Sequence, residues 1–156
     1  MNTGKITKSR SKPRNILRGI IPTADATWDT TPTSLENTTD DNNTTTTGTG
    51  TKVVSGANPV GSIIYDLGSS KNVMVTVKCA AWTSAGAIRQ TIDGSEDNIT
   101  YVEGGNYTLS TAVTSESTVY QTPLSYASGR YIKVRTFVSQ SATGNIKFYD
   151  VRAYEV

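Results

Sequence analysis

The clearest pattern in this chain is an alternation of apolar and polar residues that begins at residue 62. In the stretch 72–79 ("NVMVTVKC") every second residue is apolar, which gives a strand one buried face and one exposed face. Similar alternation recurs in 62–68, 87–92 and 130–138, and shorter strands are indicated at 99–102 and 117–123. No run shows a helical period, so the pattern predicts an all-β domain.

The last predicted strand changes phase along its length. Ile146 and Phe148 follow one alternation, whereas Val151 and Ala153 follow the other. Because a strand has a period of two, this change requires an extra residue, and we expect a β-bulge at 149–150. The pair at 93–94 (Asp-Gly) is a turn signal between two strands. Seven or eight strands joined by long loops favour a two-layer β-sandwich.

Charge is distributed unevenly. The first eighteen residues carry six basic residues and no acidic residue, while the rest of the chain carries more acidic than basic residues. This contrast indicates a basic extended arm over 1–22, followed by one domain over 23–156, and an arm that binds a negatively charged surface. We expect removal of 1–21 to leave the domain folded. The charged and apolar anchors of this assembly arm would be Lys5, Lys8, Arg10, Lys12, Arg14, Ile16, Leu17, Arg18, Ile20 and Ile21.

Composition argues against several functions. The chain has no histidine and one cysteine, which excludes an intramolecular disulfide, a cysteine zinc cluster and the usual histidine-based catalysis. The neighbouring acids Glu96 and Asp97 would point to opposite faces of a strand, so their spacing does not suit a catalytic pair. No apolar run is long enough to cross a membrane, and the basic arm has no aromatic residue for stacking on bases, so we expect neither a membrane role nor specific nucleic-acid binding. These features predict a protein that is not an enzyme.

Three segments in order resemble a known family. The stretches "GSIIYDLGSSKNVMVTVKC", "AIRQTIDGSEDNITYV" and "GRYIKVRTFVSQSATGNIKFYDVRAYEV" are similar to the strands of discoidin domains, also called coagulation-factor C-type or galactose-binding-like domains. The resemblance covers about residues 60–156 and implies an eight-stranded jelly-roll β-sandwich that binds rather than catalyses. The basic arm has no counterpart in the family, and the Asp-Gly of the family's first loop is absent.

The resemblance also implies a calcium site between an early loop and an acid near the end of the domain. An Asp/Asn/Thr loop has suitable oxygen ligands for Ca²⁺, and an ordinary solvated loop with Asx-turns is the alternative. We expect no other cofactor. The candidate calcium ligands are Asp40, Asp41, Asn43, Thr44 and Asp150.

Carbohydrate binding needs an aromatic face and a few polar groups. Trp82, between two predicted strands, is a candidate platform, and Arg89 and Tyr101 are candidate neighbours. A tryptophan beside apolar strands can instead be a core residue whose N–H finds a carbonyl. Trp28 is interpreted as a packing anchor where the arm meets the domain.

Two functional hypotheses follow. The first is a structural virion protein of a tailed bacteriophage, a capsid decoration or tail accessory subunit assembled in the host cytoplasm. Its arm would bind other capsid or tail proteins in an oligomeric assembly, and its sandwich would present a face to host surface glycans. The alternative is a carbohydrate-binding module, free or fused to a catalytic partner.

Overall fold

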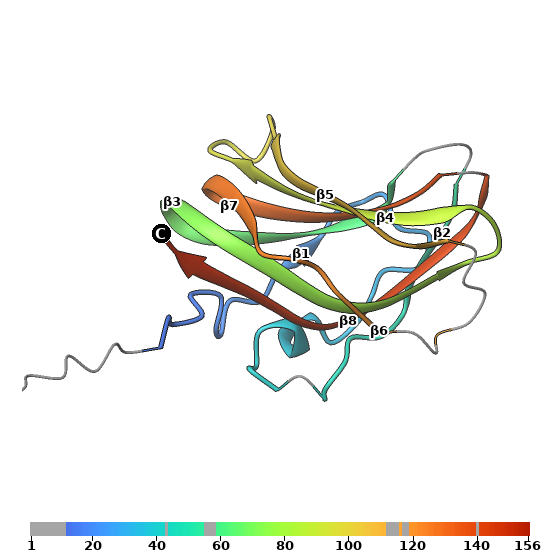
Figure 1. Ribbon diagram of the computed structural model, residues 1–156, viewed down its shortest axis with the longest axis horizontal. Coiled ribbons are helices and arrows are strands. Elements are labelled where there is room, and N and C mark those ends of the chain that lie inside the picture. The colour runs from blue at the N-terminus through green and yellow to red at the C-terminus, as the bar shows by residue number, and fades with distance from the viewer. Residues whose placement is uncertain (1–11, 43, 55–58, 112–115, 117–118, 140) are drawn as a thin grey trace, which may run out of the picture.

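In the computed structural model, the described residues form eight antiparallel strands and one short 3-10 helix (Figure 1). The structure describes residues 12–42, 44–54, 59–111, 116, 119–139 and 141–156. This architecture confirms the predicted all-β jelly roll, and the 3-10 helix is an addition that the sequence pattern did not indicate. In chain order the elements are β1 (Thr23–Ala24), η1 (Leu35–Thr38), β2 (Gly50–Val54), β3 (Pro59–Thr83), β4 (Ala87–Ser95), β5 (Val102–Thr111), β6 (Val119–Gln121), β7 (Ser125–Val138) and β8 (Ala142–Glu155).

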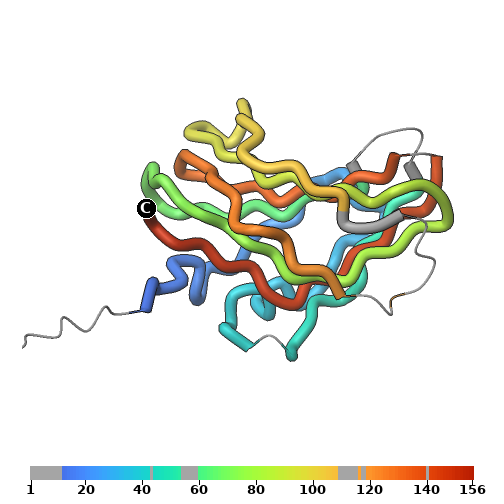
Figure 2. The backbone as a smooth tube through the Cα atoms, in the orientation of Figure 1, coloured from blue at the N-terminus to red at the C-terminus, as the bar shows by residue number. Residues whose placement is uncertain are grey.

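The strands form a curled sheet that folds over into two layers. In the first layer, β1 and the first part of β3 lie beside the second part of β7, followed by β4 and β5. In the second layer, β2 and β8 lie beside the second part of β3, which also pairs with β6 and the first part of β7. Both β3 and β7 therefore run through both layers, as Figure 2 shows.

The passage of β3 between layers occurs at a bend after Asp66. The register with β7 shifts between Asp66 and Lys71, and Gly68 has a φ of 77°, a left-handed conformation that suits glycine. The bend is closed by a bidentate ion pair, in which Arg130 donates to both carboxylate oxygens of Asp66 at 2.8 and 2.7 Å. One chain segment thus links the two layers at this end of the molecule.

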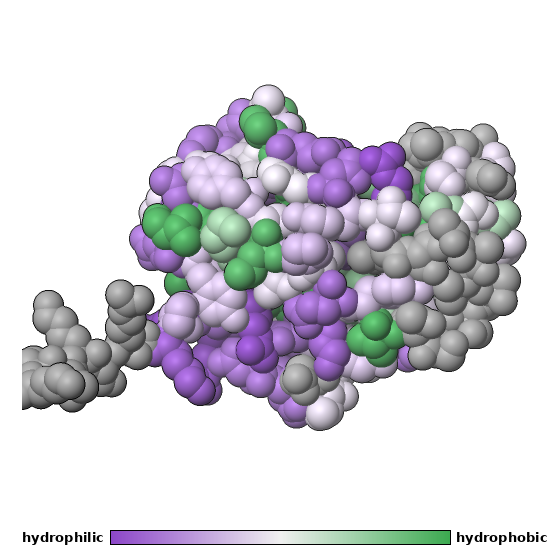
Figure 3. Space-filling model, viewed as in Figure 1, coloured by the Kyte–Doolittle hydropathy of each residue, from purple (hydrophilic) through white to green (hydrophobic). Residues whose placement is uncertain are grey.

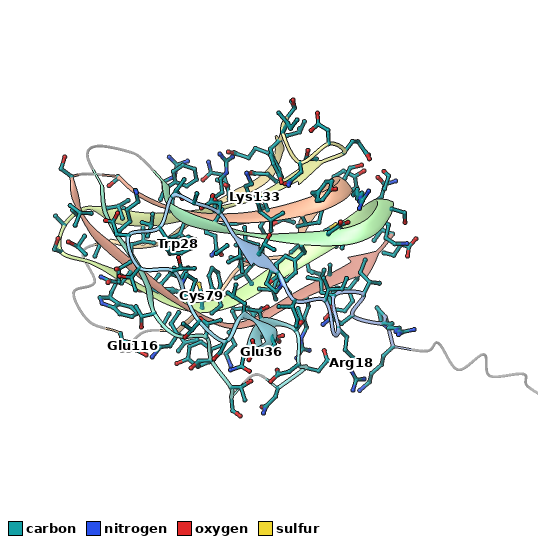
Figure 4. All side chains as sticks on the ribbon, turned by 180° about the vertical axis from the view of Figure 1, so that it is seen from behind. Arg18, Trp28, Glu36, Cys79, Glu116 and Lys133 are labelled. Atoms are coloured by element: carbon teal, nitrogen blue, oxygen red, sulfur yellow. The ribbon has the colours of Figure 1, made fainter. Side chains whose placement is uncertain are left out.

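The core lies between the layers and is built from the alternating residues of the predicted strands. Val73, Val75, Val77 and Cys79 are all fully buried, as the alternation predicts. Figure 4 shows Cys79 enclosed between the two layers of strands. Burial raises the pKa of its thiol to about 12, so Cys79 behaves as a small apolar residue rather than a nucleophile.

Trp28 packs the segment before β2 onto the first layer. Its indole Nε1 donates to the carbonyl of Ser62 at 3.1 Å, and its ring fills the space above Gly61. A Cβ at Gly61 would lie 2.2 Å from ring atoms, so only glycine leaves room for this contact. The interpretation of Trp28 as a packing anchor is confirmed.

The last strand contains the predicted bulge. Lys78 pairs with Asp150 and Cys79 pairs with Phe148, so Tyr149 is the extra residue on β8.

The prediction of a turn at 93–94 is wrong, because Asp93 and Gly94 pair with β7 inside strand β4. The chain reverses later, over 96–101. Within the described residues, no helix is long and apolar enough to span a membrane.

Candidate functional site

The outer face of the first layer carries a row of aromatic and basic side chains. On β7, Lys133, Arg135 and Phe137 point outward, alternating with the buried Ile132 and Val134. Cation–π contacts cross this row: Lys133 Nζ lies 3.7 Å from the ring centroid of Tyr101, and the Arg135 guanidinium carbon lies 5.3 Å from that of Phe137. Lys133 is labelled in Figure 4, on the outer side of β7. The row places rings and cations on one partly exposed surface.

A hollow of about 300 Å³ lies at one end of this row. Strand register brings its walls together, since Arg89 on β4 lies opposite Phe137 on β7 and next to Thr108 on β5. The hollow has the size of a small ligand site and combines one aromatic ring with polar groups. It is lined by Arg89, Thr91, Glu103, Asn106, Phe137, Val138 and Ser139.

A chain of hydrogen bonds fixes the polar wall of the hollow. Arg89 Nε donates to Asn106 Oδ1 at 3.2 Å, and Asn106 Nδ2 donates to Glu103 Oε1 at 3.1 Å. The remaining N–H groups of Arg89 and the other carboxylate oxygen of Glu103 can therefore meet a ligand as donor and acceptor. A donor and an acceptor side by side can bind neighbouring hydroxyl groups, each of which donates one hydrogen bond and accepts another.

Tyr101 lies farther along the same outer face. Its ring lies against Lys133 of β7, whose partner on the neighbouring strand β4 is Asp93. Asp93 is four residues beyond Arg89 on β4, so Tyr101 lies about 13 Å along the strand from Arg89. Burial, and then the nearby Asp93 carboxylate, raise the pKa of Tyr101 to about 12. The loop that carries Tyr101 is held by Asp97, whose carboxylate accepts from two backbone amides at 2.8 Å. Tyr101 is thus on the same outer face as the hollow but outside it.

Trp82 lies on the other layer. It is half-buried at the end of β3, where it pairs with Asn145 of β8, and its carbonyl accepts from the Asn145 side chain at 3.4 Å. Of the three predicted glycan-binding residues, only Arg89 lines the hollow. Glu103, Asn106 and Phe137, which also line the hollow, were not among the predicted residues. The alternation in 130–138 places Phe137 on the same outward face as Lys133 and Arg135, so the sequence did contain a signal for this residue.

The candidate calcium ligands in the described part of the chain already have partners. Asp40 accepts from Asn42 N at 2.8 Å and from Thr45 Oγ1 at 2.6 Å. Asp41 lies 3.2 Å from Arg18 Nε, and Thr44 donates to Asn42. Asn43 lies outside the described residues.

Asp150 sits at the bulge of β8 and is also engaged. It accepts from Arg152 Nε at 2.6 Å, and its pKa is raised, chiefly by burial. Among the residues that the structure describes, no three or more acidic, histidine or cysteine side chains come together as a metal site. Calcium binding stays a prediction, and the present donor set does not fit it because Arg18 and Arg152 are paired with Asp41 and Asp150.

The second half of the predicted arm packs on the domain itself. Leu17 is fully buried in the core, and Ile16 N donates to the carbonyl of Ala153 at 2.9 Å. Ile20 packs partly buried against the same core, and Ile21 is 64% exposed. Arg18, labelled in Figure 4, contacts Asp41 of the same chain. Ile16, Leu17 and Ile20 are therefore used within the domain, whereas Lys5, Lys8 and Arg10 lie outside the described residues.

Comparisons with known proteins place the fold. No family model matches the chain, and no curated protein matches it. Among solved structures, a chitosan-binding module of a chitosanase/glucanase from Paenibacillus sp. IK-5 aligns with a TM-score of 0.54 at 19% identity, over 91% of this chain and 98% of that one. The fold is a galactose-binding-like jelly roll.

Two further structures align over most of both chains. A CBM32 module produced by Clostridium perfringens aligns with a TM-score of 0.52 at 17% identity, covering 92% of this chain and 100% of that one. The CBM32 of AlyQ, in complex with 4,5-unsaturated mannuronic acid, aligns with a TM-score of 0.52 at 23% identity, covering 88% and 96%. All three are named as chitosan-binding or CBM32 modules, and at this identity the likeness shows the fold that this chain shares with them.

Proposed function

We propose that this protein is a carbohydrate-binding module that holds a sugar in the hollow beside Phe137. The observation that carries the proposal is the hydrogen-bonded series Arg89–Asn106–Glu103 next to an aromatic ring, in a hollow of about 300 Å³. The fold supports it, because three solved structures of this architecture are named as carbohydrate-binding modules. Binding, rather than a reaction, is the role of this site.

The chemistry of the hollow matches a sugar ring. A pyranose has an apolar face of C–H groups, which packs on an aromatic ring, and an edge of hydroxyl groups, which needs paired donors and acceptors. Phe137 supplies the ring, and Arg89 and Glu103 supply the donor and the acceptor. Because Asn106 holds both charged groups, the polar wall is organised before the ligand arrives, which lowers the entropic cost of binding.

The test is a glycan array followed by calorimetry on the best ligand. We expect Arg89→Ala and Phe137→Ala each to weaken binding about tenfold or more, since a lost charge-assisted hydrogen bond or stacked ring costs on the order of 1.4 kcal/mol or more. Thr108→Ala is the matched control, because Thr108 is exposed on β5 directly opposite Arg89 but does not line the hollow. Unchanged affinity in both site variants, or equal loss in the control, would reject this site.

A further inference from the structure

The outer face of the second layer carries a platform of tyrosines that the hollow does not use. Met74 on β3 pairs with Tyr154 on β8 and with Tyr126 on β7, so the three side chains form one row across three strands. Adjacent strands lie about 4.8 Å apart, which puts the two tyrosines about 10 Å from each other. Tyr126 is 48% exposed, and Leu124 beside it is 52% exposed.

This platform is visible on one side of the molecule. Figure 3 shows apolar side chains gathered near the C-terminal end of the domain, over β3, β7 and β8, with polar residues around them. A hollow of about 490 Å³ opens at the same place, with Met74, Leu124, Tyr154 and Val156 among its lining residues. The platform is therefore a shallow, partly apolar surface rather than a deep pocket.

Polar groups border each ring of the platform. Tyr126 Oη donates to Asn72 Oδ1 at 2.8 Å, which fixes the ring in place. Arg152 lies two residues from Tyr154 on β8. The next tyrosine of that strand is Tyr149, and its ring centroid lies 5.5 Å from Lys78 Nζ. Rings that alternate with hydrogen-bonding side chains suit a chain of sugars better than they suit a protein partner, whose contact would need an apolar centre.

The charge around the platform is mainly basic. Lys12 and Arg152 line the hollow together with one acid, Glu155, which is paired with Lys71. Arg152 donates its Nε–H to Asp150, so it is the other N–H groups of this guanidinium that can meet a ligand. This distribution favours a ligand that carries negative charge.

We propose that the platform Tyr154–Met74–Tyr126 binds a linear acidic polysaccharide, a polyuronate, at a second site separate from the hollow beside Phe137. The two tyrosines stack on sugar rings along the chain. Lys12 and Arg152 pair with its carboxylates. Salt weakens this attraction.

The test is native affinity electrophoresis of the full chain in gels that contain polygalacturonate. Two comparison polymers are used: hydroxyethylcellulose, which is neutral, and dextran sulfate, which is anionic. We expect polygalacturonate to retard the protein, and Tyr126→Ala with Tyr154→Ala to weaken this retardation about tenfold, the size of one or two lost stacking contacts. The Tyr→Phe versions at the same two positions should keep most of the binding, because they keep the rings and show that the fold is intact.

Two variants separate this proposal from the proposed function. Phe137→Ala should lose sugar binding in the hollow and keep polygalacturonate binding, and the tyrosine variants should show the reverse. The proposal is overturned if the Tyr→Ala variants bind polygalacturonate as well as the unaltered protein does. It is also overturned if dextran sulfate retards all variants as strongly as polygalacturonate does, which would indicate charge alone. A stable dimer by light scattering that Tyr126→Ala converts to a monomer would assign the platform to self-association instead.

Discussion

The carboxylate of Asp93 is fully buried in strand β4 and forms an ion pair with the guanidinium of Arg135 on the neighbouring strand. Burial is the largest influence on this group and raises the pKa of Asp93, although Arg135 opposes the change. Thr91, Glu103 and Tyr101 also lie close enough to act on it. The pair joins strands β4 and β7 under the candidate sugar site. Protonation of Asp93 therefore affects the stability of that face.

The raised pKa predicts how Asp93 affects stability with pH. An unfolded aspartate has a pKa of about 3.9, so above this pH the native state retains the proton longer than the unfolded state does. The contribution of Asp93 is most favourable near pH 4 and is lost as the pH rises through the native pKa. We expect the free energy of unfolding of the unaltered protein, minus that of Asp93→Asn, to fall between pH 4 and 7. Urea denaturation across this range measures it, and a difference that stays constant or rises would contradict the prediction.

The contact between Trp28 and Gly61 predicts a large effect from one methyl group. Gly61→Ala would place a Cβ inside the indole ring, and such overpacking costs about 1–3 kcal/mol. The second substitution Trp28→Leu should make Gly61→Ala much less costly, because the two residues share one space. Chemical denaturation of the four proteins in this cycle measures the coupling. Additive effects would show that the ring does not occupy the space above Gly61.

Leu17 predicts which part of the N-terminal segment belongs to the domain. Leu17→Ala should destabilise the protein by about 2–5 kcal/mol, since it leaves a cavity in the core. Ile21→Ala is the matched control and should change stability by less than about 0.5 kcal/mol, because Ile21 is exposed. Thermal or urea unfolding distinguishes them. For the same reason, deletion of 1–21 should destabilise the domain, contrary to the expectation from charge alone.

The partners of Asp41 and Asp150 predict the response to calcium. Arg18 and Arg152 already neutralise these carboxylates, so the melting temperature should be the same in millimolar calcium and in chelator. A bound ion at a hundred times its dissociation constant would stabilise the fold by about 2.7 kcal/mol, which a melting curve detects easily. If calcium raises the melting temperature of the unaltered protein and does not raise that of Asp150→Asn, the calcium site is established.

Much of the fold could be predicted because the signal is local. The alternation from Val73 to Cys79 and the phase change around Asp150 each lie within a single strand, and both are confirmed. The role of Leu17 could not be predicted in this way. Its burial depends on contact with β8 at the far end of the chain, and the basic residues around it indicated an arm instead.

The candidate site was only partly predictable for a related reason. Arg89 was identified, but Asn106 and Glu103 reach it only through the pairing of β4 with β5. That pairing contains two register shifts, which no spacing rule for a regular hairpin anticipates. Trp82 was predicted as the aromatic platform, whereas the ring in the hollow is Phe137.

The joining of Asn15 and Ile16 to Ala153 brings the first and last segments of the folded unit into direct contact. A peptide linker of a few residues would therefore bridge them with little loop-closure entropy. The domain should tolerate circular permutation with new ends opened in a surface loop. By the same geometry it could be inserted as a cassette into the loop of another protein, entering and leaving its host at almost the same point.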